Sequence, residues 1–402
     1  EGNNAKVAEV ATISAGSQEI GDLIAEVIAK IGKDGVVTVE PGQSLAMESE
    51  VVEGYSLDKG FASPFFVTDP ARQEAVYTKP DILITDQKIS SVQEFVPFLE
   101  KLAQAGKKDL VIIADEVDGE ALSVLVLNKL KGVFNTVVIK APAFGDKRKA
   151  IMEDLAILTG ATLVSKDHGL TFENVGLEVL GSARKVIVTK DDSTIIEGAG
   201  SSQAVKNRIK QLATWADNAS QTYEKDQFKA RQASLEGKVA VIKVGGATET
   251  EIDEKKYRVD DAVAATKAAL AEGIVAGGGV TLINLASQLK ISGSDAEKAG
   301  RQILQTALKQ PFVQIMKNAG LNAEALLAKV EEAKAGQGIN VMQPEAGLVD
   351  LKQAGVVDPV RVTKEAILNS VSIAGTAITM GALVVELPEE KPAPDMSGMG
   401  MM

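Results

Sequence analysis

Apolar positions near the start of the chain first recur at helical spacing and then become continuous. Between residues 17 and 32 they form one stripe, made of Ile20, Leu23, Ile24, Val27, Ile28 and Ile31. Ser17 precedes the stripe and can cap the helix that it predicts. The sequence Lys33-Asp34-Gly35 then predicts a turn, and the apolar run 36–39 predicts a strand.

From 81 to 165, short apolar runs alternate with helical patterns. Strands are predicted at 82–85, 110–113, 136–139 and 161–164. Helices are predicted between them at 91–105, 119–131 and 147–159. This alternation is typical of βαβ units and indicates a largely parallel sheet. Further helices are predicted as a polar hairpin over 201–235 and at 255–275, 280–290, 295–319 and 361–385.

Composition narrows the possible functions. The net charge is −12, from 43 basic and 55 acidic residues, with no basic stripe to bind nucleic acid. The chain has no cysteine and a single histidine, His168, in a predicted turn, which excludes disulfides and argues against a His-based metal site. The longest apolar stretch, 371–385, is interrupted by polar and glycine residues, so a buried helix is favoured over a membrane span. A reducing, cytoplasmic location is compatible with these features.

The run Ala276-Gly277-Gly278-Gly279 lies between two helical patterns. Glycines at the start of a helix let the backbone approach a phosphate, and the helix N-terminus offers free N–H groups. A glycine run between helices is, however, more often a tight turn than a phosphate site. The spacing alone therefore leaves both interpretations open.

Two predicted helices of the α/β block carry more apolar residues than one buried face requires, namely 95–102 and 120–128. The excess either packs against neighbouring helices or forms an exposed groove that binds protein. An aromatic-rich loop, 61–66, lies just upstream. Gly54 and Gly237 flank the block and are candidate hinges.

Several segments, in one order, resemble group I (GroEL-type) chaperonins. They are 9–15, 32–40, 140–150, 239–249, 259–286, 356–359 and the Met/Gly tail 396–402. The resemblance implies a multidomain α/β and α fold, in which a GroEL-like apical α/β domain is inserted in a helical intermediate domain and followed by a helical equatorial remnant. The implied domains are intermediate (1–53 and 239–271), apical (54–238), equatorial (272–388) and a disordered tail (389–402). It also implies that the N-terminal equatorial segment of the family is lacking here.

The resemblance implies ATP and Mg²⁺ as cofactors. Gly277 and Gly278 would lie against the nucleotide, Asp358 would bind the ribose, and Asn340 would approach the adenine. Asp261 matches the acid that orients the attacking water. The Mg²⁺ ligands are expected in the lacking N-terminal segment, so this chain alone is not expected to hydrolyse ATP.

The resemblance also implies a surface for non-native polypeptide. Its candidate residues are Phe61, Phe65, Phe66, Val96, Leu99, Leu122, Val126 and Leu127. The function implied is that of an ATP-dependent chaperonin subunit, which folds client proteins inside a ring of identical subunits closed by a lid co-chaperonin. Neither nucleic acid nor membrane is an expected partner. The alternative is a nucleotide-independent fragment that only holds unfolded polypeptide.

Overall fold

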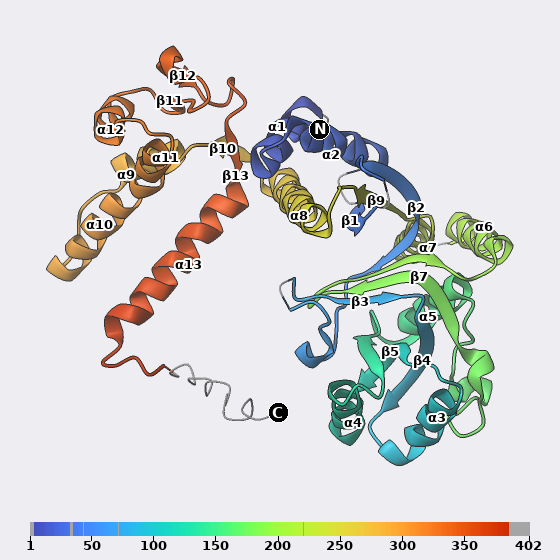
Figure 1. The fold of residues 1–402 in the computed structure, drawn as a ribbon. Coiled ribbons are helices and arrows are strands. Elements are labelled where there is room, and N and C mark those ends of the chain that lie inside the picture. Colours follow the sequence, from blue (N-terminus) through green and yellow to red (C-terminus); the bar gives the residue numbers. More distant parts are fainter. Residues whose placement is uncertain (1–3, 33–34, 43, 71, 220, 386–402) are drawn as a thin grey trace, which may run out of the picture. The chain divides into compact units, whose positions relative to one another are not determined.

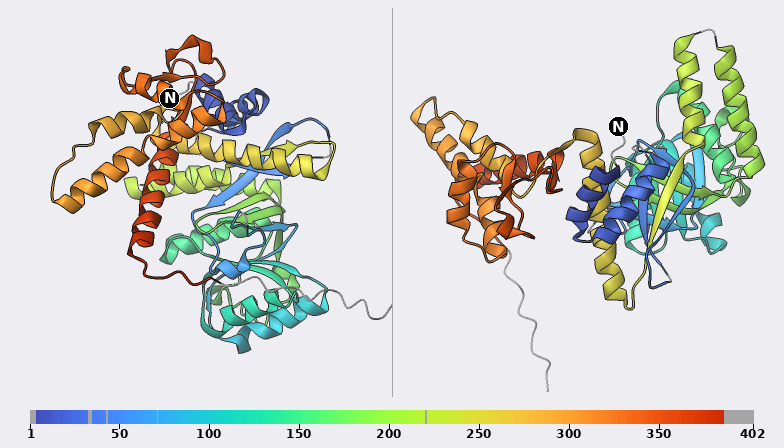
Figure 2. Two further views of the ribbon diagram at one scale, coloured as in Figure 1. Left: turned by 60° about the vertical axis from the view of Figure 1, so that its left-hand side comes forward. Right: turned by 90° about the horizontal axis from the view of Figure 1, so that it is seen from above.

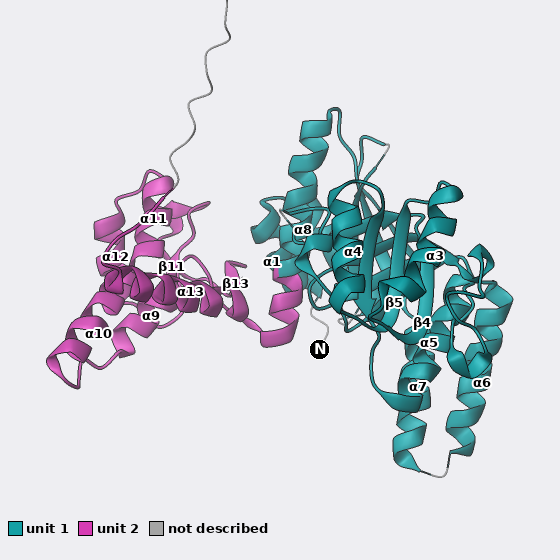
Figure 3. Ribbon diagram, turned by 90° about the horizontal axis from the view of Figure 1, so that it is seen from below, with its two compact units in different colours: residues 1–264 teal, residues 265–402 magenta. Residues whose placement is uncertain are grey.

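The structure is a computed structural model that describes residues 4–385, apart from 33–34, 43, 71 and 220. The chain divides into two compact units, residues 1–264 and 265–402 (Figure 3). The boundary lies within the long helix α8 (Glu249–Glu272). The finer division into five domain segments remains a prediction, and the predicted disordered tail and Lys33-Asp34 turn lie outside the described residues.

The first unit combines one large sheet with flanking helices (Figure 1). Its strands are β1 (Val36–Pro41), β2 (Glu48–Leu57), β3 (Ala75–Thr78), β4 (Asp81–Ile89), β5 (Asp109–Val117), β6 (Asn135–Lys140), β7 (Gly181–Val188), β8 (Ser193–Gly198) and β9 (Lys238–Val244). Its other helices are α1 (Asn4–Ala15), α2 (Gln18–Ile31), α3 (Val92–Gln104), α4 (Gly119–Leu130), α5 (Gly145–Thr159), α6 (Ser202–Asn218) and α7 (Thr222–Leu235). Short 3₁₀ turns are η1 (Pro64–Phe66), η2 (Lys166–His168) and η3 (Leu177–Val179).

The sheet is mixed, with strand order β1-β9-β2-β8-β7-β4-β5-β6 and β3 paired to β7. The predicted parallel arrangement is confirmed for β4, β5 and β6. The strand predicted at 161–164 is wrong, because this segment makes one bridge, between Thr85 and Val164, and then turns. Ser165 starts that turn by accepting a hydrogen bond from the Asp167 amide, which begins η2. The antiparallel β7–β8 pair follows in place of another parallel strand.

The main apolar stripe of α3 is buried. Phe95, Phe98, Leu99 and Leu102 are all in the core of the first unit. Phe172, from the segment after η2, packs edge-on against Phe95 with ring centroids 5.1 Å apart. Val96, outside this stripe, is half-buried, so both alternatives for the apolar excess stay open for this helix.

The predicted hairpin is confirmed as α6 and α7, which run side by side (Figure 2). Asp154 of α5 is fully buried and anchors both helices, through Arg208 Nε at 2.7 Å and Arg231 Nε at 2.7 Å. Trp215 and Phe228 pack between the two helices, with ring centroids 5.6 Å apart. Breaking a buried ion pair leaves an uncompensated charge, so these contacts fix the hairpin to the sheet domain.

The second unit is mainly helical. Its elements are β10 (Ile274–Ala276), α9 (Val280–Gln288), α10 (Asp295–Ala307), α11 (Gln310–Asn318), α12 (Ala323–Glu331), β11 (Gln337–Ile339), η4 (Pro344–Ala346), β12 (Leu348–Asp350), β13 (Val357–Pro359) and α13 (Val360–Thr379). Phe312 and Met316 of α11 lie at the centre of its core. The single helix predicted over 295–319 is wrong, because Pro311 lacks an amide hydrogen and starts a new helix instead. No helix of the described ranges is long and apolar enough to cross a membrane.

Candidate functional site

The glycine run forms a turn between β10 and α9. β10 pairs antiparallel with β13, so that Val275 lies opposite Asp358. The Gly277 amide donates to the Val356 carbonyl at 3.0 Å, and the Thr281 hydroxyl donates to the Ala276 carbonyl at 2.7 Å. These bonds bring Gly277 and Asp358, which are far apart in the sequence, to one edge of the second unit.

Packing explains two of the three glycines. A Cβ on Gly277 would lie 3.1 Å from Asp358 Oδ1, and a Cβ on Gly279 would lie 2.7 Å from the Phe312 amide nitrogen. Gly278 differs in its surroundings: its φ of +63° is left-handed like the +76° of Gly279, but a Cβ there would make only ordinary contacts, 3.9 Å from Leu351 Cδ1 and from Val356 Cγ1. Close packing therefore favours glycine at 277 and 279, whereas at 278 only the left-handed backbone of the turn favours it.

Asn340 lies in the segment that follows β11. Within β11, a Cβ on Gly338 would meet Val280 of α9 at 2.5 Å and Leu351 at 2.7 Å. The Asn340 side-chain oxygen accepts a hydrogen bond from the Met342 amide at 3.0 Å, so it already supports a local turn. A ligand at Asn340 would have to use its amide nitrogen or displace this bond.

Asp358 is the half-buried acid of this site. Burial raises its pKa above the ordinary value, because a charged carboxylate loses solvation there. A hydroxyl donor from a ligand would restore some of that lost solvation. Asp358 thus fits a hydrogen bond from a sugar hydroxyl, and the place of Gly277 and Gly278 beside a phosphate stays a prediction.

Asp261 belongs to the first unit and is exposed on α8. Its sequence neighbour Asp260 is half-buried and pairs with Arg72, whose Nη1 lies 2.8 Å from Asp260 Oδ2. Arg72 also pairs with Glu74 at 3.2 Å. The Arg72 pair joins α8 to the loop before β3, and so supports the helix turn that carries Asp261.

The described residues hold no cluster of three or more His, Cys, Asp or Glu side chains that could bind a metal ion. Magnesium in nucleotide sites needs carboxylate and phosphate oxygens in near-octahedral geometry. The residues described here do not fit a protein-held Mg²⁺ site, and no chemical step is derived through one.

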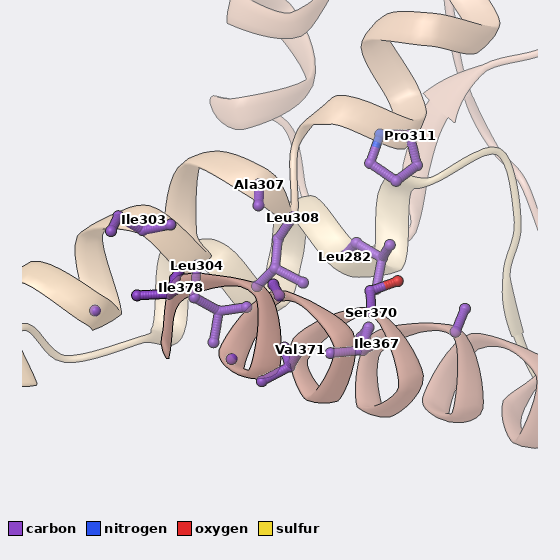
Figure 4. A pocket seen from close by; sticks show the side chains of 14 residues that line it. Leu282, Ile303, Leu304, Ala307, Leu308, Pro311, Ile367, Ser370, Val371 and Ile378 are labelled. Atoms are coloured by element: carbon purple, nitrogen blue, oxygen red, sulfur yellow. The ribbon is translucent and has the colours of Figure 1, made fainter. Parts of the chain in front are cut away.

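The second unit carries an apolar groove of about 460 Å³ between α9, α10 and α13 (Figure 4). Its walls carry Leu282, Ile303, Leu304, Val371 and Ile378, and its one polar side chain is Ser370. A nucleotide phosphate requires charge or several N–H donors, and this lining offers neither. The lining of this groove therefore does not suit the nucleotide that is expected at the glycine turn.

The predicted polypeptide-binding residues divide by exposure. Phe65 and Leu127 are 64% and 50% exposed, whereas Phe66 and Leu99 are 0% and 4% exposed. Phe61, Leu122 and Val126 are half-buried against the core, and Val96 is half-buried on α3. A client in contact with this conformation would touch Phe65 and Leu127, while Phe66 and Leu99 are explained by core packing.

The sequence reasoning missed one exposed residue of this region. Leu130 of α4 is 67% exposed, and α4 is in contact with η1, which carries Phe65. We call Phe65, Leu127 and Leu130 the α4–η1 surface. The signal for Leu130 was present, because it follows Leu127 by three residues and so lies on the same side of the helix.

A comparison with models of protein families matches residues 2–387 to the TCP-1/cpn60 chaperonin family. The match spans the glycine turn, Asp261, Asp358 and the α4–η1 surface alike.

Proposed function

The chain belongs to the TCP-1/cpn60 chaperonin family of protein-folding chaperones, and from this premise we propose that it is a subunit of an ATP-dependent, group I chaperonin. In this proposal the α4–η1 surface binds non-native polypeptide, and ATP binding in the second unit drives its release. Identical subunits would form a ring, closed by a lid co-chaperonin.

The exposure of the α4–η1 surface is the observation that carries the proposal. Leu127 and Leu130 follow one another along the exposed side of α4, and Phe65 comes from the neighbouring turn η1. Unfolded polypeptides expose apolar side chains in no fixed pattern, so a client surface needs apolar area with little shape selectivity. Aromatic and leucine side chains on a helix and a loop meet that need.

Capture of a denatured protein tests this assignment. The double change Leu127→Ser and Leu130→Ser should weaken binding of a fluorescently labelled, denatured protein by about tenfold or more, since each exposed leucine contributes roughly 1–2 kcal/mol when buried. Because both side chains are half or more exposed, the unfolding midpoint should stay within a few degrees.

Leu45→Ser is the matched control, because Leu45 is 74% exposed outside the α4–η1 surface. It should bind the denatured protein as the unchanged chain does. Equal loss of binding in the control would show that general surface hydrophobicity, and not the α4–η1 surface, captures clients.

The nucleotide part of the proposal rests on the edge where Gly277, Gly278 and Asp358 meet. Gly278 would approach a phosphate, Asp358 would accept a hydrogen bond from the ribose, and Asn340 would approach the adenine. ATP, when bound, supplies the phosphoryl group for hydrolysis. The role of this chain's residues is to hold the sugar and phosphates at the start of α9.

Calorimetric titration with ATP tests the nucleotide site. Asp358→Ala should weaken ATP binding by about tenfold, as expected for losing a hydrogen bond to a charged group. The control is Glu345→Ala, which removes an exposed acid from η4. Unchanged affinity in Asp358→Ala would remove the ribose role, and a chain without any ATP binding would favour the alternative of a nucleotide-independent holdase.

A further inference from the structure

Lys129 lies in the last turn of α4 and joins this helix to η1 and β3. Its Nζ donates to the Phe66 carbonyl oxygen at 2.5 Å and to the Tyr77 hydroxyl at 3.0 Å. The same ammonium lies 5.5 Å from the centroid of the Tyr77 ring. Phe66 and Tyr77 are both buried. A cation therefore joins α4 to η1 and β3 through contacts with buried residues.

This placement is costly for a lysine. Lysine side chains usually keep the ammonium in water and bury only the carbon stem. Here burial lowers the pKa of Lys129 to about 8. Two features favour the charged form of Lys129. The C-terminal end of a helix favours a cation, and two oxygens accept hydrogen bonds from the ammonium. The exposed lysine that follows, Lys131, shows that the same end of α4 can carry a cation in solvent.

We propose that Lys129 is a positioning residue of the α4–η1 surface: its bond to the Phe66 carbonyl fixes η1, and with it the exposed Phe65, against α4, the helix that carries Leu127 and Leu130. The inference rests on the proposed client binding. Phe65 and Phe66 are consecutive, yet one is 64% exposed and the other 0% exposed. Turning Phe65 away from the surface would rotate the Phe66 carbonyl and break its bond to Lys129.

A fixed η1 strengthens client binding through entropy. A side chain that is already held in its binding position loses less conformational freedom when a client arrives. The hydrogen bonds of η1 are few: the Phe66 amide donates to the Ser63 carbonyl and the Val67 amide to the Pro64 carbonyl, both at 3.1 Å, and the Phe65 amide donates to the Ser63 hydroxyl at 3.4 Å. The Lys129 bond is what ties this short turn to a long helix.

The test replaces Lys129 with methionine, which keeps the length of the side chain and removes the ammonium. Lys129→Met should weaken capture of a labelled, denatured protein by about tenfold, the value expected for losing a charge-assisted hydrogen bond. Hydrogen exchange at the Phe66 and Val67 amides should become faster by a similar factor. The unfolding midpoint should change by only a few degrees, because methionine fills the same apolar space.

Lys131→Met is the matched control: it removes the same charge from the same end of α4 and should bind clients within about twofold of the unchanged chain. Unchanged capture in Lys129→Met, or an equal loss in Lys131→Met, overturns the inference. If the unchanged chain captures no client, the proposed function itself fails. Should Lys129→Met not fold, Tyr77→Phe removes one acceptor only. It should then weaken capture by a few-fold and speed the same exchange, and unchanged values would overturn the inference.

Discussion

At the scale of single residues, the Arg72 network stabilises α8 and does so in a pH-dependent way. Burial raises the pKa of Asp260 to about 6, with Arg72 and Lys256 acting against the shift and Glu74 and Asp261 adding to it. Burial also raises the pKa of Glu74. Both acids therefore hold protons in the folded chain at pH values where the unfolded chain has released them.

The consequence is a measurable pH profile. Between about pH 4 and 6 the folded chain binds more protons than the unfolded chain, so the stability from Asp260 is present at pH 4 and is lost as the pH rises through 6. Asp260→Asn cannot titrate and should lose less stability than the unchanged chain over this range, measured as the thermal unfolding midpoint. Asp253→Asn, an exposed acid on the same helix, should parallel the unchanged chain. If the unfolding midpoint of Asp260→Asn also changes with pH as that of the unchanged chain does, Asp260 does not cause the pH dependence of stability.

Single-residue roles could be predicted where the interacting partner is close in the sequence. They were missed where the partner is far away in the sequence. The cap at Ser17 is confirmed, since its hydroxyl accepts from the Ile20 amide. Asp260, in contrast, looked like any helix acid, because its partner Arg72 is 188 positions away. Lys129 and Tyr77 were missed for the same reason: no sequence pattern relates a lysine at the end of a helix to a buried phenol on another element.

At the scale of elements, the geometry of the glycine turn predicts different losses of stability for alanine at 278 and at 279. Gly279→Ala would place a Cβ 2.7 Å from the Phe312 amide nitrogen at a φ of +76°, whereas Gly278→Ala would make no contact closer than 3.9 Å at a φ of +63°. Alanine at 278 should lower the free energy of unfolding only by the strain of a left-handed backbone, roughly 1–2 kcal/mol. The alanine at 279 should cost about 1–3 kcal/mol more, because backbone atoms must shift. Chemical denaturation followed by circular dichroism measures both.

Comparing the stability and the ATP affinity of the two variants distinguishes a packing role from a role in ligand binding. Gly279→Ala should be the less stable variant in the absence of nucleotide, and Gly278→Ala should be the one that loses ATP affinity out of proportion to its stability. Equal destabilisation of the two would mean that the approach to Phe312 relaxes without cost, and would remove the packing explanation for Gly279.

Element prediction was accurate for several helices of the first unit and uneven elsewhere, since α1 was not predicted and one predicted helix is two. Helical stripes marked α2, α4 and α5 to within a few residues, because the buried face of each helix repeats along its length. The run 161–164 has the composition of a strand, but a single bridge to Thr85 is all that the neighbouring strand provides. Pro311 was a sequence signal for the break between α10 and α11. The apolar pattern continues on both sides of this proline, and it led to the prediction of one helix.

At the scale of the whole molecule, the proposed catalytic acid and the proposed nucleotide residues belong to different units. Asp261 is in the first unit, and Gly278 and Asp358 are in the second. A group that reaches its substrate only when domains close stabilises the transition state more than it adds to initial affinity. In a preparation that hydrolyses ATP, Asp261→Ala should keep ATP affinity within a few-fold and lower turnover by roughly two orders of magnitude.

The control for this prediction is Asp253→Asn, which removes an exposed acid from the same helix and leaves both the Asp261 carboxylate and the Arg72–Asp260 pair intact. It should retain most of the turnover. Near-normal turnover in Asp261→Ala would identify Asp261 as a solvated helix acid and would leave the ATPase proposal without its water-orienting group.

The distribution of aromatic residues between the units has a spectroscopic consequence. The chain has one tryptophan and four tyrosines: Trp215, Tyr55, Tyr77, Tyr223 and Tyr257, all within the first unit. Intrinsic fluorescence therefore comes entirely from that unit, and its tryptophan component comes from the hairpin where Trp215 packs against Phe228. Melting of the second unit leaves these fluorophores in place. A change in Trp215 emission on addition of ATP would thus report a signal transmitted from the second unit to the α6–α7 hairpin, with no added label.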